Sequence, residues 1–250
     1  MELNYPKRTD GMYILSRADI DEIAYSLLKD FSPRNLEYPV EVDVDAFLAD
    51  YLQLLVKERY IGVIGCEALG LTVMRDSVEI PSLDDKMHPV ILKETYGNVL
   101  ISPILNGVKN RPRKRYTKAH EGAHWVLHQP YFQKADGIGQ RSLCGGFVAC
   151  RTVEQYIPTT PTTSRKVNWL EWQADTLAAS LLMPRDVFMY YTKSLLRQTG
   201  IRHGYLSAKC GQDRQLFHEI APDLCKKFSV SMRAVQIRMI HLGLIRTGAI

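Results

Sequence analysis

The residues best suited to carry chemistry lie in one short stretch, His120-Glu121-Gly122-Ala123-His124. On a helix, residues four apart share a face, so the two imidazoles would stand one turn apart and could bind the same metal ion. The carboxylate between them could take a proton from a water molecule held by that ion. This spacing predicts zinc-dependent hydrolysis of peptide bonds, with His120 and His124 as ligands and Glu121 as the general base.

The flanking residues predict the helix that this geometry needs. Apolar residues recur around the motif at helical spacing, at Ala119, Ala123, Val126 and Leu127. Thr117 could cap the start of the helix, and Pro130 is expected to end it. A helix of about fourteen residues is therefore expected, with both histidines near its middle.

A catalytic zinc ion needs a third protein ligand besides its two histidines. Glu171 is the best candidate, because it falls in the first turn or two of a second apolar helical pattern that is stopped by Pro184. Asp175 lies four residues further along the same face and could accept a hydrogen bond from the outer ring nitrogen of a liganding histidine. Asp175 and Glu154 remain weaker alternatives to Glu171 as the third ligand.

His128 lies four residues beyond His124 on the same expected helix. It would be another ~6 Å along the axis, too far to share an ion held between the first two histidines. We therefore expect a structural or supporting role for His128.

The proposed chemistry leaves two points open. A further donor to the oxyanion is expected, and Tyr156, His203 and His218 are candidates, each more readily explained as structural. Zn²⁺ is the expected metal, but two histidines and one carboxylate also accept Mn²⁺ or Fe²⁺.

Three segments together resemble the ImmA/IrrE family of bacterial and phage metallopeptidases. They run from Arg115 to His128, from Glu171 to Pro184 and from Phe228 to Ile245. The resemblance implies a gluzincin-like site in which His120, His124 and Glu171 hold zinc and Glu121 is the general base. It also implies a protein substrate, a helix-turn-helix repressor that is cut to switch on mobile-element or stress genes.

The chain departs from the family pattern in two places. Gly122-Ala123 stands where the family commonly has a bulkier residue followed by glycine, which concerns the packing behind the helix. Residues 129–168, between the two zinc helices, form a longer insertion than expected, with the composition of a short strand or hairpin plus a loop. The resemblance further implies that residues 98–102 form an edge strand against which an extended substrate is held; the alternative is an ordinary core strand.

With this resemblance, the sequence predicts an α+β protein. Residues 1–188 are expected to form a zincin-like metallopeptidase domain with N-terminal helices and a small sheet, and residues 189–250 a C-terminal helical, helix-turn-helix-like region. One helix should follow the capping box of Ser16 and Asp19 and end before Pro33. A second is expected over 45–57, and strands over 70–74, 77–80 and 98–102.

Composition restricts the setting of the protein. Of the 250 residues 46% are hydrophobic, enough to bury a sizeable core, and no long apolar run or secretory pattern is seen. We therefore expect a cytoplasmic protein without membrane association. The five cysteines include no Cys-x-x-Cys pair, so neither a disulfide framework nor a structural zinc knot is indicated.

The C-terminal region supports a rival hypothesis. Residues 222–228 and 232–242 have the outline of a helix-turn-helix, with Arg233 and Arg238 on the second helix. A basic run at 109–115 could attract an acidic substrate segment or DNA. A DNA-binding regulator, or a toxin-antitoxin component with a metal site, is the alternative function. Direct DNA binding is disfavoured, because such outlines are common in helical tails that never touch DNA.

Overall fold

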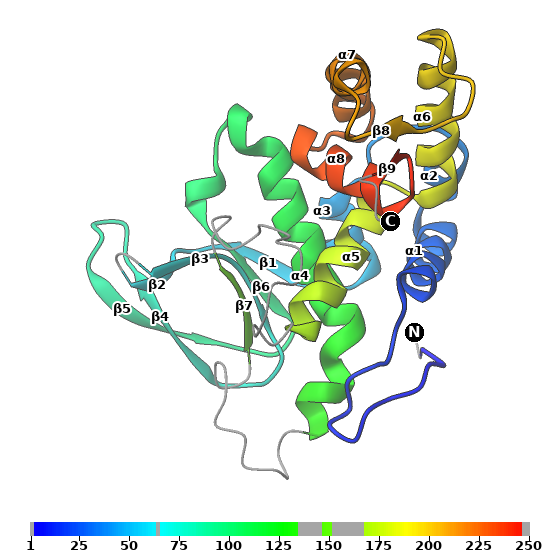
Figure 1. The fold of residues 1–250 in the computed structure, drawn as a ribbon. Helices are drawn as coiled ribbons and strands as arrows, with labels where there is room; N and C mark the ends of the chain where they lie inside the picture. Colours follow the sequence, from blue (N-terminus) through cyan, green and yellow to red (C-terminus); the bar gives the residue numbers. More distant parts are fainter. Residues whose placement is uncertain (1–2, 64–65, 135–146, 152–167, 247–250) are drawn as a thin grey trace. The chain divides into compact units, whose positions relative to one another are not determined.

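The structure is a computed structural model, and it describes residues 3–63, 66–134, 147–151 and 168–246 (Figure 1). Its contacts divide the chain into two compact units. The first comprises Met1–Ala18 and Val44–Ala178, and the second comprises Asp19–Asp43 and Ala179–Ile250. Helices and small sheets are mixed, which confirms the α+β class. The partition cuts through two helices and describes packing, so the functional division expected after residue 188 stays a prediction.

The first unit is built on a five-stranded sheet. Its strands lie in the order β1 (Leu55–Glu58), β6 (Asn98–Ile101), β3 (Cys66–Val73) and β2 (Ile61–Val63), and β7 (Phe147–Arg151) also pairs with β3. The β1–β6 pair is parallel and the others are antiparallel. A separate hairpin consists of β4 (Val78–Leu83) and β5 (Pro89–Glu94).

The expectation of an edge strand at 98–102 is wrong. These residues form β6, which is hydrogen-bonded to β1 on one side and β3 on the other. All four residues of β6 are buried, as is typical of a central strand. An extended substrate therefore has no free edge of β6 to pair with.

Strand β3 separates two sets of contacts, because successive side chains of a strand point to opposite faces. Leu71 and Val73 pack with Ile80 of β4 in a buried apolar cluster. Gly70 and Thr72, on the other face, approach helix α4 (Arg111–Lys134). One short strand thus serves both the core and the face that carries the histidine motif.

Helix α4 begins earlier than the sequence predicted. Gly107 has φ +102°, residues Val108–Asn110 form a 3₁₀ turn, and the α-helix starts at Arg111. Pro112 is tolerated there because first-turn N–H groups have no partner within the helix. Most of the basic run therefore belongs to the helix that carries the histidine motif, and Thr117 is buried inside this helix instead of capping it.

Helix α4 also ends later than predicted, because it continues through Pro130 to Lys134. Proline removes one helical hydrogen bond, and tertiary packing offsets that loss. Phe132 packs against Met74, and its carbonyl oxygen accepts a 2.8 Å hydrogen bond from Nη2 of Arg75. Long-range contacts thus hold the last turn that the local sequence disfavours.

The helix expected over 45–57 is much shorter than predicted. Helix α3 (Val44–Ala46) leads directly into a π-helix at Phe47–Tyr51. Gln53 then turns the chain with φ +56°, and β1 begins at Leu55. The pairing of β1 with β6 overrides the helical pattern of the leucines in this segment.

The second unit is mainly helical. It contains most of α1 (Arg17–Phe31), α2 (Arg34–Glu37), α6 (Arg185–Gln198), α7 (Gly211–Phe228) and α8 (Met232–His241), with a two-residue parallel pair of β8 (Leu206–Ser207) and β9 (Ile245–Arg246). The helix predicted before Pro33 is confirmed as α1, whose buried residues run from Ile20 to Leu28. The helix expected at 222–228 is only the end of α7, which continues through Pro222. Ser229, with φ +53°, separates α7 from α8.

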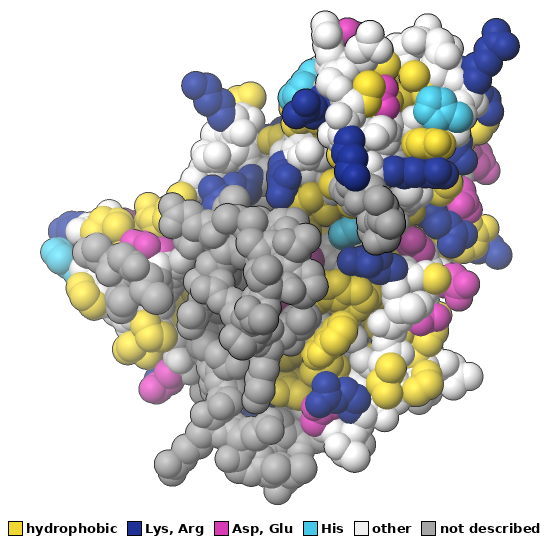
Figure 2. All heavy atoms as spheres, in the orientation of Figure 1, with side chains coloured by type: hydrophobic (Ala, Val, Ile, Leu, Met, Phe, Trp, Pro, Cys, Tyr) yellow, Lys and Arg dark blue, Asp and Glu magenta, His cyan; other side chains and the backbone are white. Residues whose placement is uncertain are grey.

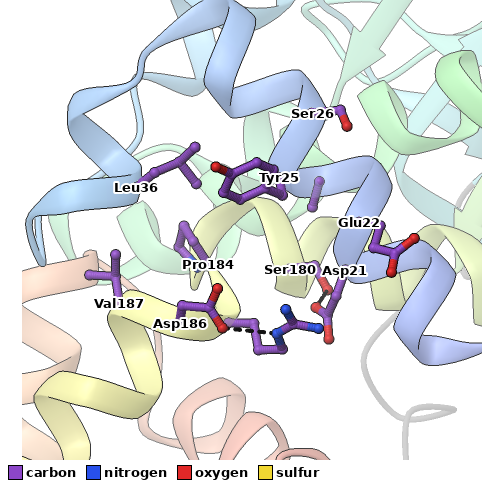
Figure 3. Close-up of a pocket in the computed structure, with 11 residues that line it drawn as sticks. Asp21, Glu22, Tyr25, Ser26, Leu36, Ser180, Pro184, Asp186 and Val187 are labelled. Carbon is purple, nitrogen blue, oxygen red and sulfur yellow. Dashed lines mark hydrogen bonds and ion pairs between the residues drawn. The ribbon is translucent and has the colours of Figure 1, made fainter.

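A buried ion pair links the first and last helices of the second unit. Nη2 of Arg238 lies 2.6 Å from Oδ1 of Asp21, and the two side chains are 3% and 8% exposed. Ser180 also donates to Asp21 (2.7 Å), and Nε of Arg238 donates to the carbonyl oxygen of Met183 (3.1 Å). Figure 3 shows Asp21 and Ser180 beside a pocket that is also lined by Tyr25, and no residue of the histidine motif lines it.

Within the described part of the chain, no helix combines the length and the apolar character needed to cross a membrane.

Replacing Asp21 by alanine should destabilise the second unit strongly. Arg238 would remain buried without its carboxylate partner, at a cost of about 3–5 kcal/mol. The free energy of unfolding in urea measures this effect. Asp186→Ala is the matched control, because its pair with Arg185 is largely exposed and should contribute less than about 1 kcal/mol. Equal losses in both variants would contradict the role given to the buried pair.

Candidate metal centre

Three side chains from two helices of the first unit converge on one point. Helix α4 supplies His120 and His124, and helix α5 (Trp169–Leu182) supplies Glu171 from its first turn (Figure 1). The Nε2 atoms of the two histidines are 2.9 Å apart. The Glu171 carboxylate lies 3.2 Å from the first and 3.5 Å from the second.

This cluster has the donors and spacing of a metal site. Its three ligand atoms all lie within 4.8 Å of one another. Ligand atoms bound at about 2.0–2.2 Å to a tetrahedral zinc ion lie about 3.3–3.5 Å apart, so little movement would be needed to bind one. Two imidazoles and one carboxylate can hold a metal ion, and the same set accepts more than one kind of metal.

Asp175 holds the ring nitrogen of His120 that faces away from the cluster. Its Oδ1 lies 2.9 Å from Nδ1 of His120, and the Tyr116 hydroxyl lies 3.2 Å from the same oxygen. Since a carboxylate only accepts hydrogen bonds, Nδ1 of His120 carries the hydrogen and Nε2 can direct its lone pair at the cluster. The structure therefore places Asp175 against the outer nitrogen, the position expected from the sequence, rather than among the ligands.

The charges of the ligands suit a cation. Burial opposes ionisation of Glu171, but hydrogen bonds to His120 and His124 outweigh it and lower the pKa of this carboxyl. Burial lowers the pKa of His124, which favours its neutral form. An ionised carboxylate and a neutral imidazole are the protonation states that metal ligands require.

Glu121 is completely buried beside the cluster and is held by one oxygen only. Thr72 donates a 2.7 Å hydrogen bond to its Oε2. Its Oε1 has no hydrogen-bond partner among the residues that the structure describes. A buried acceptor without a donor is costly, so this oxygen suits a donor that arrives from outside the chain, such as water.

Burial raises the pKa of Glu121 to about 8, although the charge of His120 and the Thr72 hydrogen bond partly oppose this effect. A cation bound by the neighbouring ligands would favour the ionised form and lower the pKa again. The carboxyl group is therefore suited to gaining and losing a proton near neutral pH.

Gly70 makes room for Glu121. A Cβ atom at position 70 would lie 2.4 Å from Oε1 of Glu121 and 2.7 Å from Cγ2 of Thr117. Only glycine lets β3 approach α4 this closely. Sequence reasoning missed both Gly70 and Thr72, although a glycine inside a strand pattern is a signal for a close approach.

Gly122 is one of the two departures from the pattern of the family that the sequence resembles. A Cβ atom at this position would lie 2.7 Å from Cδ2 of Leu48, a buried residue of the π-helix. The space beside residue 122 is thus filled by Leu48 of the π-helix rather than by a side chain of the motif.

The remaining candidate residues lie elsewhere. Glu154 and Tyr156 are outside the described residues. His203 and His218 belong to the second unit, where their rings contact Tyr205 and Phe217. The predicted short strand in the insertion is present as β7, while most of 129–168 lies outside the described residues.

Comparison with protein-family models gives no match for the chain, and comparison with curated proteins gives none either. The function must therefore be argued from the site itself.

Glu171→Ala should lower the affinity for zinc by more than about 100-fold, since losing a ligand should exceed the 10–100-fold that outer partners typically contribute. Competition with a chromogenic chelator measures the affinity. Glu154→Ala tests the alternative third ligand and should bind zinc as the wild type does. The reverse result, with zinc lost only in Glu154→Ala, would move the third ligand to residue 154.

Proposed function

We propose that the protein is a zinc-dependent endopeptidase with a zincin-like core. The observation that carries the proposal is the juxtaposition of two features of one motif. His120 and His124 converge with Glu171 into a group able to hold a metal ion, and Glu121 presents a buried carboxylate oxygen without a partner beside them. Metal-assisted hydrolysis requires metal ligands, a general base and a group that positions the base, which is Thr72 here.

His120, His124 and Glu171 would hold the metal, which when bound would polarise a water molecule and the substrate carbonyl. Glu121 accepts a proton from that water at Oε1, while Thr72 keeps its Oε2 in place. The water oxygen bonds to the peptide carbon and the carbon–nitrogen bond breaks. Glu121 then returns the proton to the leaving amine, a role that its burial-raised pKa allows.

We propose a helix-turn-helix repressor as the substrate, on the strength of the resemblance to ImmA/IrrE peptidases. One structural feature brings the insertion close to the site. Strand β7 of the insertion pairs with β3 alongside Gly70 and Thr72, with Cys150 opposite Gly70 and Val148 opposite Thr72. The insertion thus contributes backbone next to the strand that holds Glu121.

The rival role in DNA binding loses support from the second unit. Of the two arginines on the second helix of this outline, Arg238 is 2% exposed and paired with Asp21, while Arg233 donates to Gln236. On the face drawn in Figure 2, Lys and Arg side chains over the C-terminal helices are interspersed with acidic, apolar and uncharged ones. A surface that binds DNA would concentrate its basic side chains on one face.

The test is incubation of the protein, with zinc or manganese supplied, with the helix-turn-helix repressor encoded next to it. Mass spectrometry should find a single new pair of fragments. Glu121→Gln should bind zinc as before but cut about 10²–10⁴-fold more slowly, because it removes the general base. The matched control is Glu219→Gln, the same change at an exposed position of α7.

Turnover at the wild-type rate in Glu121→Gln would rule out the assigned base. An intact repressor in the presence of the metal-loaded wild type would count against this substrate and would favour a role in complex formation.

A further inference from the structure

His128 is a fully buried histidine that the proposed reaction does not use. Its side chain is 0% exposed, and it is not one of the three residues of the cluster. Instead its Nδ1 lies 2.8 Å from Nδ1 of His124, and its Nε2 lies 3.1 Å from Oε1 of Gln173. The Gln173 side chain in turn reaches the backbone carbonyl of Tyr13, 2.7 Å from its Nε2.

The direction of each hydrogen bond in this series follows from the bond to the Tyr13 carbonyl. A carbonyl oxygen only accepts, so the amide nitrogen of Gln173 must face Tyr13. The amide oxygen of Gln173 then faces His128 and accepts a hydrogen from its Nε2. The orientation of Gln173 therefore decides which nitrogen of His128 carries hydrogen.

The same logic continues to the metal ligand. His128 is fully buried, and its two ring nitrogens face the His124 ring and the uncharged amide of Gln173. A charged ring there would lack a counter-ion, so the His128 ring is neutral and its Nδ1 carries a lone pair. Nδ1 of His124 must then donate to it, which leaves the lone pair of His124 on Nε2. Nε2 is the atom that joins the cluster with His120 and Glu171.

We propose that the Tyr13 carbonyl, Gln173 and His128 form a hydrogen-bond relay that fixes the tautomer and ring orientation of His124. Gln173 and His128 are thus positioning residues of the metal site. The role of this relay in catalysis rests on the proposed function, whereas the hydrogen bonds themselves do not. Each liganding histidine has its own support, a carboxylate for His120 and a neutral relay for His124. Such outer partners typically change metal affinity by about 10–100-fold.

The relay makes the N-terminal segment part of the site. Tyr13 is held by a β-bridge to Lys7, and the Lys7 ammonium lies 4.9 Å from the Tyr13 ring. Gly11, with φ +90°, packs so closely on α4 that a Cβ atom there would lie 2.5 Å from the carbonyl oxygen of Pro130. The segment that supplies the carbonyl is therefore fixed against the zinc helix.

The first test is nitrogen NMR of the wild-type protein with ¹⁵N-labelled histidine, assigned with a His128→Gln variant. The relay predicts hydrogen on Nε2 of His128 and on Nδ1 of His124, both with and without zinc. Hydrogen on Nδ1 of His128, or on Nε2 of His124 in the metal-free protein, would overturn the proposal. This measurement needs no variant of the relay to remain folded.

The second test compares two replacements of Gln173 by chelator competition for zinc. Gln173→Leu removes the acceptor and should weaken zinc binding by about 10–100-fold. In Gln173→Glu, burial should keep the carboxyl group protonated, with its hydrogen on the oxygen that faces Tyr13. This variant keeps both hydrogen bonds and should restore most of the zinc affinity. Thr176→Val is the control, since Thr176 is a buried hydroxyl of the same helix that bonds only within α5. Wild-type affinity in Gln173→Leu would overturn the relay.

The two proposals fail separately. The predicted tautomers together with an uncut repressor would support the relay and count against the peptidase. Repressor cleavage with the opposite tautomers would remove the relay and leave the peptidase standing.

Discussion

Two ring nitrogens and a carboxylate present their lone pairs to the same small volume, and their mutual repulsion has to be offset by a proton or a metal cation. His120 and His124 have their Nε2 atoms 2.9 Å apart, with Glu171 beside both. The surrounding protein holds this arrangement through outer contacts on each imidazole. Burial favours the neutral form of His124, while Glu171 is ionised. These three side chains together therefore attract a cation.

The close approach of strand β3 and helix α4 serves this site directly. Gly70 leaves space for the Glu121 carboxylate, and Thr72, two residues on and on the same face, holds one of its oxygens. The opposite face of β3 packs into the apolar cluster of the sheet. The carboxyl group of Glu121, the proposed base, is thus held by a strand of the core, which positions it better than a loop would.

The sequence predicted the parts of the site that depend on local spacing. The interval of four between His120 and His124 and between Glu171 and Asp175 determines shared helix faces, and the structure places all four side chains together. Contacts made across long separations were missed, such as that of Gly70 with Glu121. The ends of α4 were also misjudged, since tertiary packing carries the helix past Pro130.

Zinc X-ray absorption of the loaded wild-type protein tests the central claim most directly. The account predicts two imidazole nitrogens and carboxylate and water oxygens, all at about 2.0–2.2 Å, with no sulfur neighbour. A sulfur shell at about 2.3 Å would place the metal on cysteines instead. That result, or a third imidazole in the first coordination sphere, would contradict the site built from His120, His124 and Glu171.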